Sequence, residues 1–288
     1  MKNKVWINNR FVDADKAKVS VFDRGFMYGD GVFETMRSYA GVVFKLDEHI
    51  KRLYTSLAVL GIKPPYSRPR LKAIVYKTLK ANALKSAYIK VSVTRGEGRF
   101  GIGYKDEFRP NTVVVAKDFE GYPDWMFDKG LSAAVAGIRQ NELSVLSRVK
   151  SHNFLTYIIA RFEAKDMGYD EAILANTKGH IVEAATSNIF LAKNGAVITP
   201  SLLSGILPGI TRATVLGIAR RLGLPVREKT VSYKDLLSAD EVFLTNSLAE
   251  ILPVTKIGPK RIGEGSPGEV TKLLRISYQK EVIRAVIR

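Results

Sequence analysis

Segments with the period of strands and segments with the period of helices mix along this chain without strict alternation, and this order limits its fold. Strict alternation would predict a parallel sheet wound with helices, whereas the mixed order predicts an α+β fold. The expected strands cover residues 5–7, 10–12, 31–39, 87–94, 112–116, 132–138, 171–175, 181–190 and 241–245. The expected helices cover residues 46–60, 69–83, 154–167, 211–222, 232–237 and 268–288. Asn8-Asn9 is expected to form a hairpin turn, and Asp47 to cap the first helix.

An aperiodic stretch separates these segments into two groups. Residues 118–130 combine Gly, Pro and Asp with bulky aromatic side chains and follow neither period. A chain of 288 residues is also long enough for two domains. We therefore expect a small N-terminal domain over 1–118, a linker over 119–130 and a large domain over 131–288.

Composition excludes several classes of function. The chain has no cysteine and only three, widely spaced, histidines, so we expect neither disulfides nor a metal site. The net charge of +17 comes from Lys and Arg scattered along the chain, which favours small anionic substrates over nucleic acid. Without a signal peptide or an apolar run of membrane-spanning length, a cytoplasmic protein is expected.

Lys150 stands immediately before an apolar helix, and Glu183 follows later in the chain. A lysine with little access to water loses its proton more readily, and the free amine can form a Schiff base with an aldehyde. A carboxylate such as Glu183 could keep the pyridine nitrogen of pyridoxal phosphate protonated. The alternative interpretation of Lys150 is a solvated surface charge.

Two polar segments and one arginine are candidates for binding phosphate. Residues 207–212 place Gly209 and the N–H groups of Ile210 and Thr211 at a helix start, where anions bind. The alternative is a Pro-Gly turn followed by an N-capping threonine. Residues 245–248 leave a strand with polar groups, and Arg52 could supply the cation that a phosphate dianion needs.

Four glycines lie between residues 95 and 103, but their spacing does not match a dinucleotide-binding loop. A strand-like segment follows them instead of a helix, which excludes a Rossmann fold. The segment is either a loop near a pocket, with Arg95 or Arg99 available to bind carboxylates, or a long hairpin.

Together these segments resemble the class IV, fold type IV, pyridoxal-phosphate enzymes. This family contains branched-chain aminotransferases, D-amino acid aminotransferases and aminodeoxychorismate lyases. The resemblance covers nearly the whole chain and rests on six segments in the family's order: 23–35, 48–53, 149–151, 183–190, 207–212 and 240–254.

The resemblance implies two α/β domains with pyridoxal 5'-phosphate in the cleft between them, and a homodimer or higher homo-oligomer whose neighbouring subunit helps close each site. It implies that Lys150 is the Schiff-base lysine, which also moves the substrate proton, and that Glu183 pairs with the pyridine nitrogen. With the residue arguments above, the expected cofactor-binding residues are Arg52, Lys150, Glu183, Asn188, Leu207, Gly209, Ile210, Thr211 and Ser247. The expected substrate-pocket residues are Tyr28, Phe33, Thr35, Arg37, Arg95, Arg99 and Leu248.

Departures from each subfamily leave the reaction open. Branched-chain enzymes usually have Gly at Thr35, Gly-Thr-Ala at 246–248 and a tyrosine at Phe154, and the Arg-x-His pair of D-amino acid enzymes has no match here. Residues 33–37, 150–152 and 245–248 resemble the lyases, whereas 94–96 and 170–172 resemble archaeal-type branched-chain enzymes.

Both chemistries begin with removal of a proton from the substrate carbon. We favour an aminotransferase acting on a small branched-chain or D-amino acid and a 2-oxo acid, because proton return through Lys150 needs no special substrate. The alternative is an aminodeoxychorismate lyase that releases pyruvate and forms 4-aminobenzoate.

Overall fold

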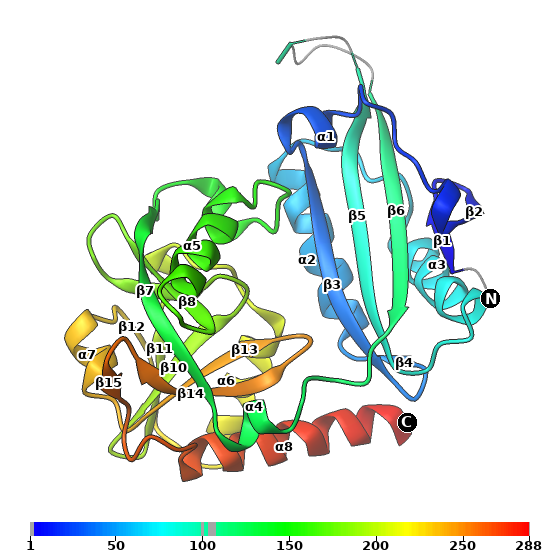
Figure 1. The fold of residues 1–288 in the computed structure, drawn as a ribbon. Coiled ribbons are helices and arrows are strands. Elements are labelled where there is room, and N and C mark those ends of the chain that lie inside the picture. Colours follow the sequence, from blue (N-terminus) through cyan, green and yellow to red (C-terminus); the bar gives the residue numbers. More distant parts are fainter. Residues whose placement is uncertain (1–2, 99–100, 103–107, 288) are drawn as a thin grey trace. The chain divides into compact units, whose positions relative to one another are not determined.

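The computed structural model describes residues 3–98, 101–102 and 108–287 (Figure 1). The chain divides into two compact units: unit 1 contains Met1–Glu120, Val149–Asn153 and Ala285–Arg288, and unit 2 contains Gly121–Arg148 and Phe154–Arg284. Val149–Asn153 and Ala285–Arg288, which lie within the range expected for the large domain, are grouped with unit 1.

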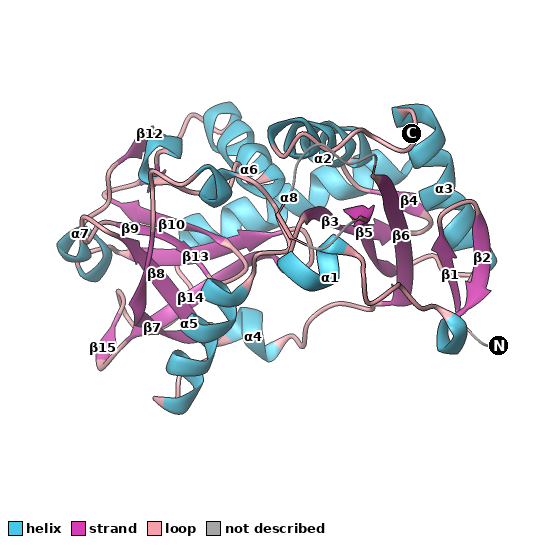
Figure 2. Cartoon of the chain, turned by 90° about the horizontal axis from the view of Figure 1, so that it is seen from above, coloured by secondary structure: helices cyan, strands magenta, loops and turns pink. Residues whose placement is uncertain are grey.

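Unit 1 is an antiparallel sheet in the strand order β2-β1-β6-β5-β3-β4. Its strands are β1 (Lys4–Ile7), β2 (Arg10–Asp13), β3 (Gly31–Tyr39), β4 (Val42–Val43), β5 (Ala87–Glu97) and β6 (Arg109–Asp118). Its helices include α1 (Arg24–Tyr28), α2 (Leu46–Val59) and α3 (Arg68–Ala81). In Figure 2, α2 and α3 lie on one side of the strands.

Side-chain alternation gives this sheet two different faces. Val32 and Met36 of β3 point into a core with Leu53 and other apolar side chains of α2 and α3. Because successive strand residues point to opposite faces, Phe33, Thr35 and Arg37 belong to the face away from this core. The alternation that predicted β3 thus also places its expected substrate residues together. Helix α2, however, begins after Lys45, so the expectation that Asp47 caps it is wrong; Asp47 lies in its first turn.

Unit 2 contains a closed ring of strands, because β9 pairs with both β8 and β10. The ring runs through β10 (Asn188–Lys193), β13 (Glu241–Asn246), β14 (Glu250–Ile257), β7 (Leu131–Gln140), β8 (Glu171–Asn176) and β9 (Ile181–Ala184). Further strands are β11 (Ala196–Pro200), β12 (Val226–Lys229) and β15 (Lys260–Arg261). The helices are α4 (Trp125–Asp128), α5 (Leu155–Asp166), α6 (Ile210–Arg221), α7 (Tyr233–Leu237) and α8 (Glu269–Ile287).

One expectation for unit 2 is wrong in detail. The single strand expected over 181–190 is two strands, β9 and β10, because Ala184 N donates to Ser187 O in a tight turn. Within the expected linker, the short helix α4 carries Met126 and Phe127, which pack against a cluster that includes Leu252 of β14. Among the described residues, no helix is long and apolar enough to span a membrane.

Candidate active site

Backbone pairing with β3 fixes the segment around Lys150. Lys150 O accepts a hydrogen bond from Phe33 N at 2.9 Å, and His152 N donates to Gly31 O at 2.9 Å. Lys150 Nζ lies 4.6 Å from the centroid of the Phe33 ring. These contacts explain why the segment belongs to unit 1, and they hold the lysine beside Phe33, an expected substrate-pocket residue.

Arg52 lies in a buried ion pair. Its Nε and Nη2 donate to the two carboxylate oxygens of Glu34, each at 2.7 Å, and His49 Nδ1 lies 2.7 Å from Glu34 Oε2. Burial alone would raise the pKa of Glu34, but the charge and hydrogen bonds of Arg52, with His49, lower it to about 2. Burial lowers the pKa of His49 in spite of Glu34, so a neutral imidazole donates through Nδ1. Glu34 therefore sets the orientation of the Arg52 guanidinium.

Lys90 joins Phe33 and Thr35 on the face of the sheet away from the core. It pairs with Thr35 in the register of β3 and β5, and its Nζ lies 4.6 Å from the Phe33 ring centroid. Burial lowers the pKa of Lys90. The sequence reasoning missed this residue, although the alternation of β5 places it on the same face as Phe33.

The expected carboxylate-binding arginines have different surroundings. Arg95 donates from Nε to Asp30 at 2.7 Å and from Nη2 to Leu60 O at 2.6 Å, so it ties loops of unit 1 together. Arg37 donates to Glu120 O at 3.3 Å and lies over two aromatic rings. Arg99 lies outside the described residues. Tyr28 accepts a hydrogen bond from Gly101 N at 3.3 Å.

In unit 2, Glu183 is buried, with only 4% of its surface exposed, and it accepts four hydrogen bonds. Oε1 accepts from Gln140 Nε2 at 3.0 Å and from Tyr157 OH at 3.3 Å. Oε2 accepts from Asn188 Nδ2 at 3.3 Å and from Leu207 N at 3.2 Å. The structure thus brings Glu183, Asn188 and Leu207 together as expected, and adds Gln140 and Tyr157, which the sequence did not indicate.

The N-terminus of α6 is open to a ligand. The N-cap of α6 is Gly209, whereas the alternative interpretation of the sequence had Thr211 there. Gly209 has no side chain that could bond the N–H groups of the first turn. A Cβ added to Gly209 would lie 1.8 Å from Asn188 Oδ1, so any other residue there would force the Asn188 side chain to move. Thr211 is buried, and Ser247 and Leu248 follow the end of β13. Uncapped N–H groups at a helix start are donors suited to phosphate.

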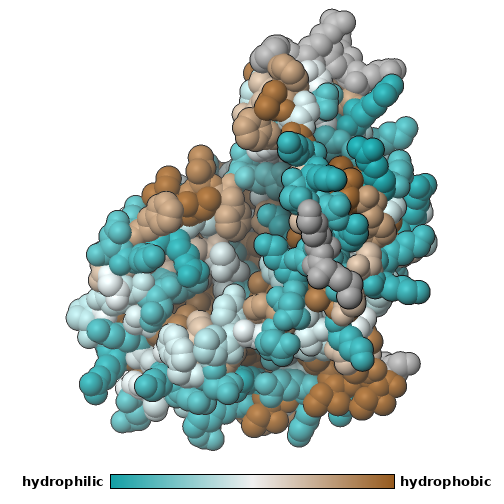
Figure 3. Space-filling model, turned by 45° about the vertical axis from the view of Figure 1, so that its right-hand side comes forward, coloured by the Kyte–Doolittle hydropathy of each residue, from teal (hydrophilic) through white to brown (hydrophobic). Residues whose placement is uncertain are grey.

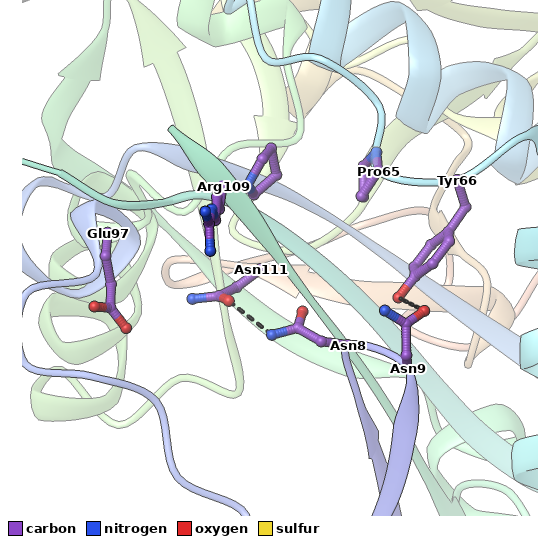
Figure 4. A pocket seen from close by; sticks show the side chains of 8 residues that line it. Asn8, Asn9, Pro65, Tyr66, Glu97, Arg109 and Asn111 are labelled. Carbon is purple, nitrogen blue, oxygen red and sulfur yellow. Dashed lines mark hydrogen bonds between the residues drawn. The ribbon is translucent and has the colours of Figure 1, made fainter. Parts of the chain in front are cut away.

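A separate cavity of about 550 Å³ in unit 1 lies by the hairpin turn between β1 and β2 (Figure 4). Its polar lining includes Asn8, which donates to Asn111 at 2.8 Å, and Asn9, which accepts from Tyr66. None of the expected site residues lines it, so the cavity does not mark the candidate active site.

Comparison with known proteins identifies the family. A model of the family described as amino-transferase class IV matches residues 31–257. The chain is 41% identical to a protein of Methanocaldococcus jannaschii named as a branched-chain-amino-acid aminotransferase, over 96% of this chain and 95% of that protein. It is 34% identical to the D-alanine aminotransferase of Bacillus licheniformis, over 97% of each chain. It is also 34% identical to the aminodeoxychorismate lyase of Bacillus subtilis, over 96% of this chain and 94% of that protein.

Solved structures support the same relationship. The branched-chain amino acid aminotransferase of Escherichia coli matches with a TM-score of 0.92 and 32% identity, over 96% of this chain and 93% of that chain. The enzyme of that name from Thermobaculum terrenum, solved in its PLP form, matches with a TM-score of 0.88 and 28% identity, over 99% and 95%. The family and the mixed α and β fold predicted from the sequence are therefore confirmed.

Proposed function

Because the chain belongs to the class IV aminotransferase family, we propose that it is a pyridoxal-phosphate-dependent aminotransferase. It moves an amino group between a small amino acid, branched-chain or D-, and a 2-oxo acid. The observations that carry this proposal are a lysine held beside Phe33 in unit 1 and, within unit 2, a buried carboxylate that accepts hydrogen bonds near a helix start without a side-chain cap.

The residues present fit this cofactor. Pyridoxal phosphate needs an amine for its aldehyde, a carboxylate for its ring nitrogen and hydrogen-bond donors for its phosphate. Lys150 and Glu183 meet the first two needs. The N–H groups of Ile210 and Thr211, the Ser247 hydroxyl and Arg52 meet the third. When bound, the protonated ring supplies an electron sink for the charge left on the substrate carbon.

Each of these cofactor-binding residues has a specific role in the proposal. Lys150 Nζ would hold the aldehyde carbon of the cofactor, and the same amine would remove and return the substrate proton. Glu183 would keep the ring nitrogen protonated. Asn188 donates to Glu183 and to Leu207 O, and the Leu207 side chain would pack on the ring. Gly209 lets the backbone approach the phosphate.

The outer face of the unit 1 sheet suits a small amphipathic substrate. Phe33 offers an apolar surface and Thr35 a hydroxyl. Lys90 offers an amine whose pKa is lowered by burial. We propose that Lys90 or Arg37 binds a substrate carboxylate. Arg95 is a weaker candidate because Asp30 and two carbonyl groups engage its guanidinium. Tyr28, Leu248 and Arg99 remain proposed pocket residues.

The alternative function is the lyase. Thr35 adds a hydroxyl and bulk where branched-chain enzymes have glycine, and a lyase is among the relatives at 34% identity. The reaction itself distinguishes the two. Single L- and D-amino acids are added to the loaded protein, and the cofactor's absorbance is followed. Conversion to the amine form by an L-branched or D-amino acid supports the aminotransferase, whereas no conversion, with pyruvate released from aminodeoxychorismate, supports the lyase.

We also propose that the protein is a homodimer or higher homo-oligomer in the cytoplasm. Patches of apolar side chains interrupt an otherwise hydrophilic surface (Figure 3). Helix α5 alone exposes Leu155, Ile158, Ile159 and Phe162, with Leu155 71% exposed. Apolar patches of this kind mark interaction surfaces in soluble proteins. Sedimentation velocity of the wild type and a Leu155→Glu, Phe162→Glu double variant tests this, since only the variant should sediment as a monomer.

A further inference from the structure

The carboxylate of Glu183 has one oxygen whose hydrogen-bond donors have no assigned role. Leu207 and Asn188, which bond Oε2, belong to the expected cofactor-binding residues. Oε1 accepts from Gln140 and Tyr157, which lie at the end of β7 and in the first turn of α5. A strand and the α-helix that follows it thus both donate to a single carboxylate oxygen.

The amide of Gln140 has only one acceptable orientation. Its Nε2 donates both to Glu183 Oε1 and to Gly205 O. Its Oε1 is buried without a hydrogen-bond partner among the described residues. Turning the amide over would place Oε1 against Glu183 Oε1 and Gly205 O, which are both acceptors. The observed orientation leaves Oε1 without a described partner but keeps the Nε2 hydrogen bond to Glu183. This arrangement indicates that the two hydrogen bonds donated by Nε2 stabilise the site more than one accepted by Oε1 would.

Tyr157 is restricted to donating. Burial, and then the charge and hydrogen bond of Glu183, raise the pKa of its phenol far above the ordinary value. The phenol therefore keeps its proton at neutral pH and donates a hydrogen bond to Glu183. Its ring packs against Phe154, with 4.9 Å between the ring centroids, so the hydroxyl can be removed while the packing stays.

Neutral donors stabilise the ionised form of a buried carboxylate without adding a cation that would compete with a positively charged ligand. Gln140 and Tyr157 are both of this kind. A pyridinium N–H carries the positive charge that could form an ion pair with the Glu183 carboxylate. Resting on the proposed pairing of Glu183 with the ring nitrogen, we propose that Gln140 and Tyr157 are positioning residues that fix Glu183 Oε1 and keep Glu183 ionised toward the pyridinium.

The test compares pyridoxal phosphate with its 1-deaza analogue, in which a carbon replaces the ring nitrogen. The full chain is freed of cofactor and reloaded, and the dissociation constant of each ligand is measured by fluorescence for the wild type and for Tyr157→Phe. Loss of one hydrogen bond to an ion should weaken pyridoxal phosphate about tenfold. The analogue, which offers no N–H to Glu183, should bind both proteins alike. Gln140→Met provides a second variant with the same expectation.

Tyr233→Phe, at an exposed position of α7, is the matched control and should change neither constant. If Tyr157→Phe and Gln140→Met weaken both ligands equally, or neither ligand, the positioning role is wrong while the proposed function stands. If the wild type binds the analogue as tightly as pyridoxal phosphate, Glu183 does not pair with the ring nitrogen, and the proposed function fails at that step.

Discussion

Replacing Glu34 by Gln removes the charge at the centre of the unit 1 ion pair while keeping the size of the side chain. The pKa of Glu34 falls from 4.5 to about 2 in the folded protein. At about 1.4 kcal/mol for each tenfold change in proton affinity, the ionised carboxylate contributes about 3 kcal/mol to the free energy of unfolding at neutral pH. Arg52, only 12% exposed, would then keep its charge and lose the ionised carboxylate of Glu34 beside it.

Thermal unfolding of the cofactor-free protein measures this loss, because a bound ligand would add its own stabilisation. A loss of about 3 kcal/mol should lower the Tm by roughly 6–12 °C at pH 7. The folded pKa of Glu34 lies below the unfolded one, so its contribution is complete above pH 4.5 and is lost as the pH falls toward 2. The difference between Glu34→Gln and the wild type should therefore fall to about half or less at pH 3.

Glu48→Gln is the matched control on the same stretch of chain. Glu48 is 49% exposed and pairs only with Lys45 among its described salt-bridge contacts, so its loss should cost under about 1 kcal/mol. Equal Tm changes in the two variants, or a loss in Glu34→Gln that is the same at pH 3 and pH 7, would refute the reasoning.

Three further predictions concern other parts of the molecule. Gly209→Ala should weaken pyridoxal phosphate at least tenfold because its Cβ would displace Asn188, whereas Gly217→Ala, with its nearest neighbour at 3.6 Å, should not; equal affinities measured by fluorescence would contradict this. Ser232→Ala removes the capping box of α7 and should cost about 1 kcal/mol in urea unfolding; no shift of the midpoint would refute it. Lys90→Met should raise the KM for 2-oxo acids about tenfold in steady-state assays, and an unchanged KM would exclude Lys90 as a carboxylate-binding residue.

Elements whose side chains face two different environments were among those predicted from the sequence. The alternation of β3 and the helical period of α2 are visible because one face of each is buried and the other is not. The strand β11, whose residues are all buried and show no alternation, was missed, although β8 is equally buried and was predicted. The strand β14 was missed because Pro253 interrupts it.

Some site residues could not be found from the sequence, for a physical reason. Lys150 was found from its motif, but its membership of unit 1 depends on backbone pairing with Phe33, which no local pattern records. Gln140 and Tyr157 look like an ordinary strand end and a helical residue. Their proposed role depends on the pairing of β8 with β9, which buries Glu183 within reach of both.

The central claim is that Lys150 holds the cofactor, and chemical fixation tests it most directly. Sodium borohydride converts the link between pyridoxal phosphate and its lysine into a stable bond, and peptide mapping by mass spectrometry then locates the modified residue. The account predicts the phosphopyridoxyl group on Lys150. Lys90 Nζ lies at the same 4.6 Å distance from the Phe33 ring and is the natural competitor. A label on Lys90, or on any lysine other than Lys150, would contradict the account.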